Sequence, residues 1–425
     1  MMQGYADYKD SGVDWLEEIP AEWELTKLGS CLSPFSEKNH PDLPLLSITR
    51  ELGVIERDVE NQDTNHNYIP DDLSGYKLLK KGQFGMNKMK AWQGSYGVSP
   101  FTGIVSPAYF MFDFTKEIDP DFFHVAIRSK LYVSFFGSAS DGVRIGQWDL
   151  SKPRMKEIPL ALPPLPEQTA IADFLDDKTA KIDDLARIKQ RQIELLAERK
   201  KILIQNAVTK GLNPDAPMKD SVIDWIGEIP AHWEVKPAKH LFSEVDERSE
   251  NGDEELLSVS HLTGVTPRSE KTVSMFLAED YSGSKICVEG DLVFNIMWAW
   301  MGALGVSAQL GIVSPSYAVF RQLKSQTFNP VYLEMLVQSL GYIEHYNKVS
   351  TGLHSSRLRF YSHMFLSMKI GYPSFEEQEH IVQFLAKETG KISKAISVLE
   401  NQIIKLNEYK TTLINAAVTG KIKVA

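Results

Sequence analysis

Residues 163–175 read PPLPEQTAIADFL, and neither glycine nor proline occurs from residue 167 to residue 210. Proline is tolerated in the first turn of a helix but not in its interior, so a long helix is predicted to begin here. An uninterrupted helix over these 44 residues would be about 65 Å long. A second segment of the same character runs from residue 376 to residue 419 and contains one glycine, Gly390.

These helical segments belong to a larger duplication, because most of the chain is present twice. The sequence DWLEEIPAEW at residues 14–23 recurs as DWIGEIPAHW at residues 224–233. Residues 72–112 match residues 280–320 at 20 of 41 positions without a gap. Repeats of this length indicate two tandem domains rather than a solenoid, which is built from shorter and more numerous units.

Both helical segments carry apolar residues at alternating steps of three and four, the spacing of a coiled-coil seam. Two arrangements fit this pattern. One is a helical hairpin that packs on a core, and the other is an antiparallel pair, one helix from each repeat, that holds two globular domains apart. We favour the second. The residues assigned to the seam and to contacts with partner proteins are Ile171, Phe174, Leu175, Ile182, Ile193, Leu196, Leu203, Ile381, Phe384, Leu385, Ile392, Leu399, Ile403, Leu406 and Leu413.

The remainder of each repeat has short apolar runs between turn signals and is rich in glycine, aromatic and β-branched residues, which predicts a mixed α/β domain. The predicted fold class is therefore α+β, with two tandem α/β domains joined by two long antiparallel coiled-coil helices around a pseudo-twofold axis. The predicted globular domains are residues 1–158 and 216–368, and the predicted spacer helices lie in residues 159–215 and 369–425.

Composition excludes several classes of protein. The chain has 425 residues, 43% of them apolar, and a net charge of −10. It is therefore neither a disordered chain nor one that holds nucleic acid by bulk positive charge, although local basic patches stay possible. Two cysteines exclude a disulfide framework and a cysteine-based zinc site. Residues 292–320 are uncharged, but their Asn, Gly and Pro residues make a poor membrane span. The first residues lack a secretory signal, so a cytoplasmic protein is expected.

The motifs of an enzyme site are missing from the sequence. It contains no Walker P-loop and no Gly-x-Gly-x-x-Gly segment, so adenine methylation with a cofactor held in this chain is unsupported. The ten histidines are scattered without a His-x-x-x-His pair, which argues against a metal site. We therefore predict a protein that is not an enzyme and assign it no catalytic residue, metal ligand or cofactor.

Basic side chains instead gather in stretches without acidic residues. Residues 73–112 contain no Asp or Glu, and the same holds for residues 351–375. Lys and Arg neutralise phosphates, while Gln and Ser contact bases or sugars. The alternative for each cluster is an ordinary solvated surface. The residues predicted to bind a nucleic acid, which the resemblance described below implies to be DNA, are Lys77, Lys80, Lys81, Lys88, Lys90, Gln93, Ser95, Arg144, Gln147, Lys152, Arg154, Ser355, Arg357 and Arg359.

The two repeats differ at polar positions while keeping their Gly and Ser-Pro framework. The replacements are Lys88 by Ile296, Lys90 by Trp298 and Gln93 by Met301. Such a pattern suits two different recognition surfaces on one scaffold. We expect Trp92 and its counterpart Trp300 to be buried, as large aromatic residues usually are.

Over nearly its whole length the sequence resembles the specificity subunit of type I restriction-modification systems. The resemblance lies in residues 9–23 and their copy at 219–233, in residues 82–87, in the Ile-Val-Ser-Pro turns, and in Pro-Pro-Leu-Pro-Glu-Gln at 163–168 leading into residues 171–175. The second repeat departs from this pattern at residues 372–378, where the double proline is lost.

The resemblance implies that each globular half is a target-recognition domain for one half of a bipartite, asymmetric DNA site. The helices would set the spacing and dock two adenine-methyltransferase subunits, which would bind S-adenosylmethionine. A separate motor-nuclease subunit would use ATP and Mg²⁺ to cleave unmodified DNA. Two alternatives stay open: a coiled-coil scaffold with protein partners only, and the remnant of a self-contained modification enzyme.

Overall fold

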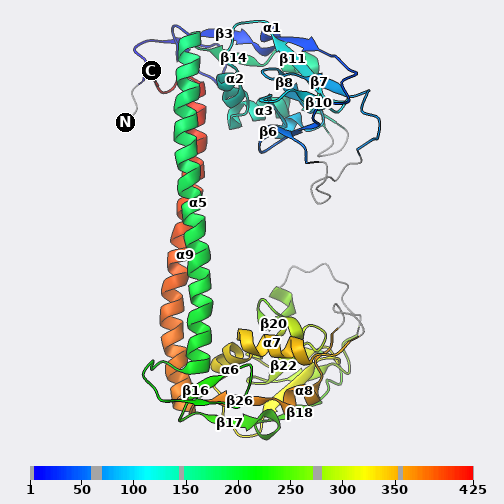
Figure 1. The fold of residues 1–425 in the computed structure, drawn as a ribbon, viewed down its shortest axis with the longest axis vertical. Helices are drawn as coiled ribbons and strands as arrows, with labels where there is room; N and C mark the ends of the chain where they lie inside the picture. Colours follow the sequence, from blue (N-terminus) through cyan, green and yellow to red (C-terminus); the bar gives the residue numbers. More distant parts are fainter. Residues whose placement is uncertain (1–3, 59–68, 143–147, 271–279, 353–357, 425) are drawn as a thin grey trace. The chain divides into compact units, whose positions relative to one another are not determined.

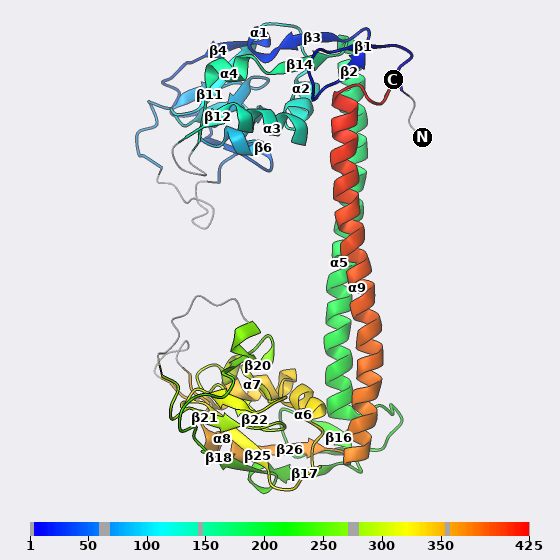
Figure 2. The same ribbon diagram turned by 180° about the vertical axis from the view of Figure 1, so that it is seen from behind.

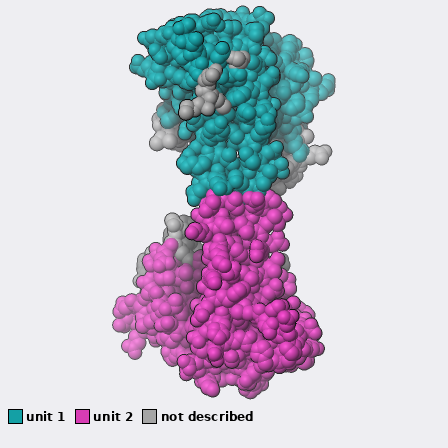
Figure 3. Space-filling view, turned by 90° about the vertical axis from the view of Figure 1, so that its left-hand side faces the viewer, with its two compact units in different colours: residues 1–190, 400–425 teal, residues 191–399 magenta. Residues whose placement is uncertain are grey.

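The computed structural model describes residues 4–58, 69–142, 148–270, 280–352 and 358–424. The chain divides into two compact units, which are residues 1–190 with 400–425 and residues 191–399 (Figure 3). We call them the first unit and the second unit. Each contains one globular domain and one half of each long helix, and each is described by itself.

The long helices are α5 (Leu165–Lys210) and α9 (Phe375–Val418), which pass from one unit into the other. They lie side by side in both ribbon views (Figure 1 and Figure 2). In the first unit, Lys189 Nζ donates to Gln402 Oε1 at 2.7 Å and Lys410 Nζ donates to Asp183 at 2.6 Å. Residue numbers fall along one helix as they rise along the other, so the helices run antiparallel. This confirms the predicted helix pair, and α9 continues through Gly390.

Most residues assigned to the seam are turned inward within their own unit. Those that are buried are Ile171, Leu175, Ile182, Ile381, Leu385, Ile392 and Leu413. Half-buried side chains are those of Phe174, Ile193, Leu196, Leu203, Leu399, Ile403 and Leu406. Phe384 is the exception, because its side chain is exposed. Within each unit, these side chains are therefore most buried where the helices enter the domain core and less buried farther along the helices.

The domain of the first unit is built from short antiparallel strands. They form a four-stranded sheet in the order β4-β11-β8-β9 and the pairs β1-β2, β3-β14, β5-β6, β7-β10 and β12-β13. The strands are β1 (Tyr8–Asp10), β2 (Glu18–Pro20), β3 (Glu24–Lys27), β4 (Leu32–Phe35), β5 (Leu46–Thr49), β6 (Gly53–Glu56), β7 (Lys77–Leu79), β8 (Phe84–Met86), β9 (Tyr96–Val98), β10 (Gly103–Val105), β11 (Phe110–Phe114), β12 (Ser140–Asp141), β13 (Asp149–Leu150) and β14 (Pro159–Leu162). The short helices are α1 (Leu28–Cys31), η1 (Ala91–Gln93), α2 (Pro120–Ile127), α3 (Lys130–Ser138) and α4 (Lys152–Lys156).

The second unit repeats this plan. Its four-stranded sheet has the order β18-β25-β22-β23, and its pairs are β15-β16, β17-β26, β19-β20 and β21-β24. The strands are β15 (Met218–Asp220), β16 (Glu228–Pro230), β17 (Glu234–Pro237), β18 (Phe242–Val245), β19 (Leu257–Ser260), β20 (Gly264–Pro267), β21 (Lys285–Cys287), β22 (Leu292–Phe294), β23 (Leu304–Val306), β24 (Gly311–Val313), β25 (Ala318–Gln322) and β26 (Lys369–Tyr372). The short helices are η2 (Ala238–His240), η3 (Arg268–Glu270), η4 (Ala299–Met301), α6 (Pro330–Val337), α7 (Leu340–Val349) and α8 (Ser362–Ser367).

The core of each domain includes the ends of the long helices. In the first unit, Ile171 and Leu175 of α5 and Ala417 of α9 belong to one buried cluster with Trp23 and Phe122. In the second unit, Val208 of α5 and Ile381 and Leu385 of α9 join the equivalent cluster around Trp233 and Tyr332. The start of one helix and the end of the other thus fill each domain core, so the globular domains are not separable from the helix ends.

A buried glutamine fixes the start of each long helix to its domain. Gln168 accepts a hydrogen bond from the backbone NH of Asp119 at 2.9 Å and donates to the carbonyl of Pro163 at 2.9 Å. Asp119 in turn caps α2 by accepting from Asp121 and Phe122. Gln378 and Asn329 repeat this arrangement in the second unit.

Candidate nucleic-acid interface

A tight turn between β8 and β9 presents the side chains predicted to bind DNA in the first unit. We call residues 87–94 the first turn. The buried Asn87 shapes it, because its Nδ2 donates to Tyr109 Oη at 3.2 Å and its Oδ1 accepts from the backbone NH of Met89 at 3.2 Å. Gly94 closes the turn at φ 94°, a backbone conformation that glycine adopts without strain. The turn is therefore rigid, and its outward side chains are held on a fixed backbone.

The equivalent turn in the second unit, residues 295–302, has the same internal bonds. Asn295 Nδ2 donates to Tyr317 Oη at 3.0 Å, and Asn295 Oδ1 accepts from the backbone NH of Met297 at 3.3 Å. Gly302 has φ 87°. We call this the second turn. Two turns with one backbone design carry different surface side chains, which is the usual relation between a rigid scaffold and a variable binding loop.

The first turn presents cations. Lys88 Nζ lies 3.0 Å from Asp149 of β13, so its charge is largely neutralised within the protein. Lys90 is exposed, and it forms no ion pair with any residue that the structure describes. Gln93 is half-buried and Ser95 is buried, so Ser95 lies behind the turn rather than on its surface. Lys90 is thus the side chain of this group best placed to meet a phosphate.

The second turn presents apolar side chains. Met297 is 40% exposed, Trp298 48% and Met301 40%. The indole of Trp298 stacks on that of Trp300 with ring centres 6.1 Å apart. Trp92 and Trp300 are both half-buried, so our expectation that they belong to the core was wrong. In the first unit, Trp92 packs instead against Trp148 at 5.1 Å.

The segment beside each turn carries opposite charges in the two units. The backbone NH of Leu150 donates to the carbonyl of Lys88 at 3.1 Å, which brings Asp149 beside the first turn. The NH of Phe360 donates to the carbonyl of Ile296 at 2.9 Å, which brings Arg359 beside the second turn. Arg359 is exposed and lacks an ion-pair partner within the described part of the chain.

The other residues predicted to bind DNA are dispersed over the first domain. Lys77 Nζ donates to the carbonyl of Tyr109 at 2.7 Å, and burial lowers its pKa. Lys80 pairs with Glu37 at 3.2 Å, and Lys81 is exposed. Lys152 lies 3.9 Å from the ring centre of Phe110, and Arg154 pairs with Asp141 at 3.0 Å. Arg144, Gln147, Ser355 and Arg357 lie outside the described residues.

Sequence reasoning did not identify the two tyrosines that support the turns. Tyr109 and Tyr317 support Asn87 and Asn295 from 22 positions further along the chain. The signal was available, since each repeat has the same Asn-to-Tyr spacing. It could not be interpreted without knowing that β8 and β11 pair, which places the tyrosine under the turn.

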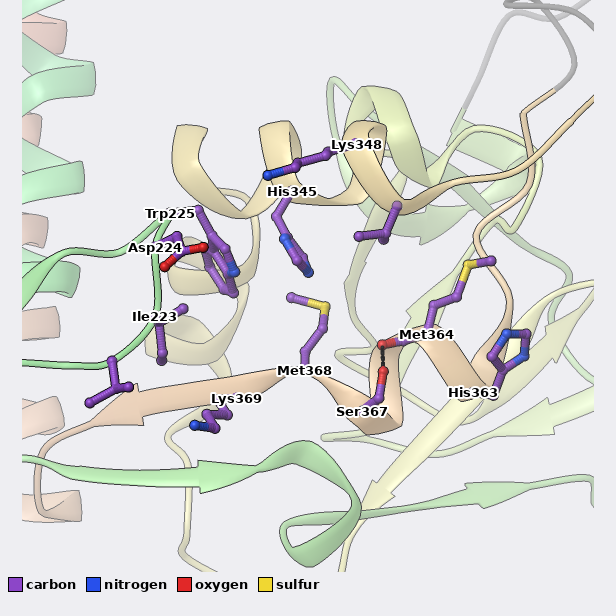
Figure 4. Close-up of a pocket in the computed structure, with 12 residues that line it drawn as sticks. Ile223, Asp224, Trp225, His345, Lys348, His363, Met364, Ser367, Met368 and Lys369 are labelled. Atoms are coloured by element: carbon purple, nitrogen blue, oxygen red, sulfur yellow. Dashed lines mark hydrogen bonds between the residues drawn. The ribbon is translucent and has the colours of Figure 1, made fainter.

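A separate hollow in the second unit has a volume of 530 Å³ and is lined by the loop at residues 222–225, α7 and α8 (Figure 4). His345 lies against Trp225, stacked with ring centres 4.6 Å apart, above Met368. Burial and the nearby Lys348 lower the pKa of His345, so this imidazole is neutral at neutral pH. None of the described residues lining the hollow belongs to the set predicted to bind DNA.

The described residues contain no cluster of His, Cys, Asp and Glu side chains that could hold a metal ion. No helix in the ranges that the structure covers is long and apolar enough to cross a membrane.

Comparison with known proteins gives one consistent result. Residues 114–195 match the family model described as the type I restriction modification DNA specificity domain. The type I restriction enzyme MjaVIII specificity subunit of Methanocaldococcus jannaschii is 26% identical over 428 aligned positions, which cover 96% of this chain and 94% of that protein. The chain is thus similar, over nearly its whole length, to type I restriction-modification specificity subunits. Members of this family are not catalytic; they are the DNA specificity subunits of their systems.

Solved structures share the fold. A chain from a study of the complex assembly and conformational transition of the type I restriction-modification system aligns with a TM-score of 0.65 at 15% identity, covering 94% of this chain and 98% of that one. The HsdS subunit from Thermoanaerobacter tengcongensis aligns with a TM-score of 0.57 at 14% identity, covering 95% and 98%. As in these structures, the fold here is α+β, with two β-rich domains and two long helices that pack together.

Proposed function

We propose that this specificity subunit recognises a bipartite, asymmetric DNA site, with residues 1–158 binding one half and residues 216–368 the other. The observation that carries the proposal is the pair of turns at residues 87–94 and 295–302. Their backbones are held by the same hydrogen bonds, yet one exposes Lys90 and the other Trp298. Base edges in the major groove differ in hydrogen-bonding groups and methyls, so unlike side chains on like scaffolds select unlike sequences.

The long helices act in this proposal as a spacer and as a docking surface for two methyltransferase subunits. Residues 159–215 and 369–425 would keep the distance between the half-sites fixed, because an antiparallel coiled coil is stiff along its length. Apolar side chains such as Phe384, Leu185 and Ile404 are exposed on these helices, and exposed apolar groups are typical of protein interfaces.

All catalytic steps would be carried out by the partner subunits. The adenine-methyltransferase subunits would bind S-adenosylmethionine, and motor-nuclease subunits would use ATP and Mg²⁺. The complex would work in the cytoplasm on chromosomal DNA. Within it, this chain contributes only positioning, because the family is not catalytic.

Mapping adenine methylation in the host genome, with and without this gene, tests the proposal. We expect one asymmetric motif made of two short half-sites with a gap of fixed length, methylated only when the gene is present. Methylation that persists without the gene, or a continuous motif, would contradict the proposal. A scaffold with protein partners only would leave the methylation pattern unchanged.

A further inference from the structure

The second turn carries an apolar surface that is exposed and yet firmly held. Met297, Trp298 and Met301 each expose 40% or more of their surface within a few residues. Trp300 anchors them, since its Nε1 donates to the carbonyl of Met297 at 2.9 Å while its ring stacks on Trp298. A group of large apolar side chains that is exposed and preorganised marks a binding surface.

Charge around this surface favours DNA as the ligand. Residues 292–320 contain no acidic residue, and the exposed Arg359 stands beside Ile296 through the hydrogen bond of Phe360. At the matching place in the first unit, Lys88 is neutralised by Asp149. The second turn therefore combines an apolar platform with an available cation at its edge. DNA fits both features, because its phosphates would meet the cation and an apolar group of a base would meet the platform.

The apolar side chains limit what can be recognised. The thioethers of Met297 and Met301 and the alkyl chain of Ile296 cannot distinguish the donor and acceptor patterns of base edges. In the major groove the only apolar feature that differs between base pairs is the C5 methyl group of thymine.

Resting on the proposed function, we infer that the second turn recognises thymine methyl groups in its half-site. Trp298 and Met301 form the contact surface, and Arg359 binds an adjacent phosphate or base. The first turn has Lys90 and Gln93 at the corresponding positions and serves as a hydrogen-bonding and phosphate-binding counterpart. The apolar surface thus makes the second domain selective for a half-site that contains thymine.

The test compares thymine with deoxyuridine, which lacks only the methyl group. The full chain, assembled with its methyltransferase partners, is used to select a preferred sequence from a random duplex library. Duplexes of that sequence are then made with deoxyuridine replacing thymine in one half-site at a time. We expect replacement in the second half-site to weaken binding about three- to fourfold for each contacted methyl, and Trp298→Ala or Met301→Gln to abolish that difference.

Met89→Ala in the first turn is the matched control, because Met89 is exposed at the position equivalent to Met297. It should leave the thymine-to-deoxyuridine difference in the second half-site unchanged. Equal affinity of the unaltered complex for both duplexes would overturn the inference while the proposed function stands. Loss of methyltransferase binding in Trp298→Ala, measured by gel filtration, would also overturn it, because the surface would then contact a protein. Failure to select any sequence would instead contradict the proposed function, and the inference with it.

Discussion

The two turns at residues 87–94 and 295–302 share their backbone hydrogen bonds and an exposed methionine, Met89 or Met297, but differ in the side chains beside it. Asn87 and Asn295 each hold a tyrosine hydroxyl, and Gly94 and Gly302 each close the turn with positive φ. Outside this frame, Lys90 stands where the second unit has Trp298. The shared interior contacts therefore fix the backbone of each turn but do not determine which side chains the turn exposes.

The two units also differ in the side chains that bond to β9 and β23, the strands that follow the turns. His124 accepts from the backbone NH of Val98 at 3.2 Å, and Glu334 accepts from the NH of Val306 at 3.2 Å. Arg128 lies beside His124, whereas Gln338 lies beside Glu334. One structural task, accepting a hydrogen bond from a buried amide on the edge strand β9 or β23, is thus performed by a histidine in one unit and by a carboxyl group in the other.

The largest expected effect comes from charging the helix ends inside the domain cores. Leu175→Asp should unfold the first unit and Leu385→Asp the second, because each side chain is buried in its unit. We expect a loss of about 4 kcal/mol or more in the free energy of unfolding. Hydrogen exchange resolved by residue would show which unit opens.

Leu185→Asp and Val398→Asp are the matched controls, since both side chains are about half exposed. They should change stability little. If Leu175→Asp opened both units equally, the comparison of two separate cores would fail.

Lowering the pH should change the stability of the two units in opposite directions. Burial and Arg128 lower the pKa of His124 to about 4, so its contribution to stability is present above about pH 6.5 and is lost as pH falls towards 4. Burial raises the pKa of Glu334, so its contribution is present at low pH and is lost as pH rises through the raised pKa. The His124 effect amounts to at most about 3 kcal/mol.

Hydrogen exchange of the Val98 and Val306 amides between pH 4.5 and 6.5, corrected for intrinsic rates, measures both effects. Protection of Val98 should rise with pH, and protection of Val306 should fall. His124→Gln and Glu334→Gln should flatten the respective trends. Parallel trends in both units would show that these two groups do not govern local stability.

A smaller effect is expected from the glutamines that fix the long helices. Gln168→Ala and Gln378→Ala each leave buried backbone groups without a partner, which costs about 1–3 kcal/mol. Gln378 makes one further hydrogen bond, to the carbonyl of Thr327 at 2.9 Å, so Gln378→Ala should be the more destabilising. Thermal unfolding of both variants, with Asp173→Ala at an exposed position of α5 as a control, measures the order. The reverse order would mean that the third bond adds nothing.

Sequence reasoning reached the architecture because its signals are local. The prolines before residue 167 and the spacing of residues 175, 182 and 193 predict a helix and its inward face without tertiary information. Phe384 was assigned to the seam or to contacts with partner proteins, and its exposed side chain is available for the second role.

The predicted DNA contacts depended on information that the sequence lacks. Whether a lysine is available is decided by tertiary contacts. Lys88 meets Asp149 because the backbone NH of Leu150 bonds to the carbonyl of Lys88, and Lys77 donates to the carbonyl of Tyr109. Both partners lie more than 30 positions away, so charge clustering along the chain overestimated the number of free cations.

The smallest predicted effect follows from this difference between lysines. Lys90→Ala should weaken binding to any duplex and reduce the salt dependence of binding by about one phosphate contact. Lys88→Ala should do less, because Asp149 already neutralises Lys88. Affinities for a non-specific duplex at several salt concentrations give both slopes. A larger change for Lys88→Ala would show that its ion pair opens when DNA binds.

The central claim, that each domain recognises its own half-site, is tested most directly by an exchange of domains. Residues 21–150 are replaced by the corresponding segment of a related specificity subunit with a different target, and adenine methylation is mapped in cells that carry the hybrid. The account predicts that one half of the motif changes while the other half and the gap stay the same. A change in both halves, or in neither, would contradict it.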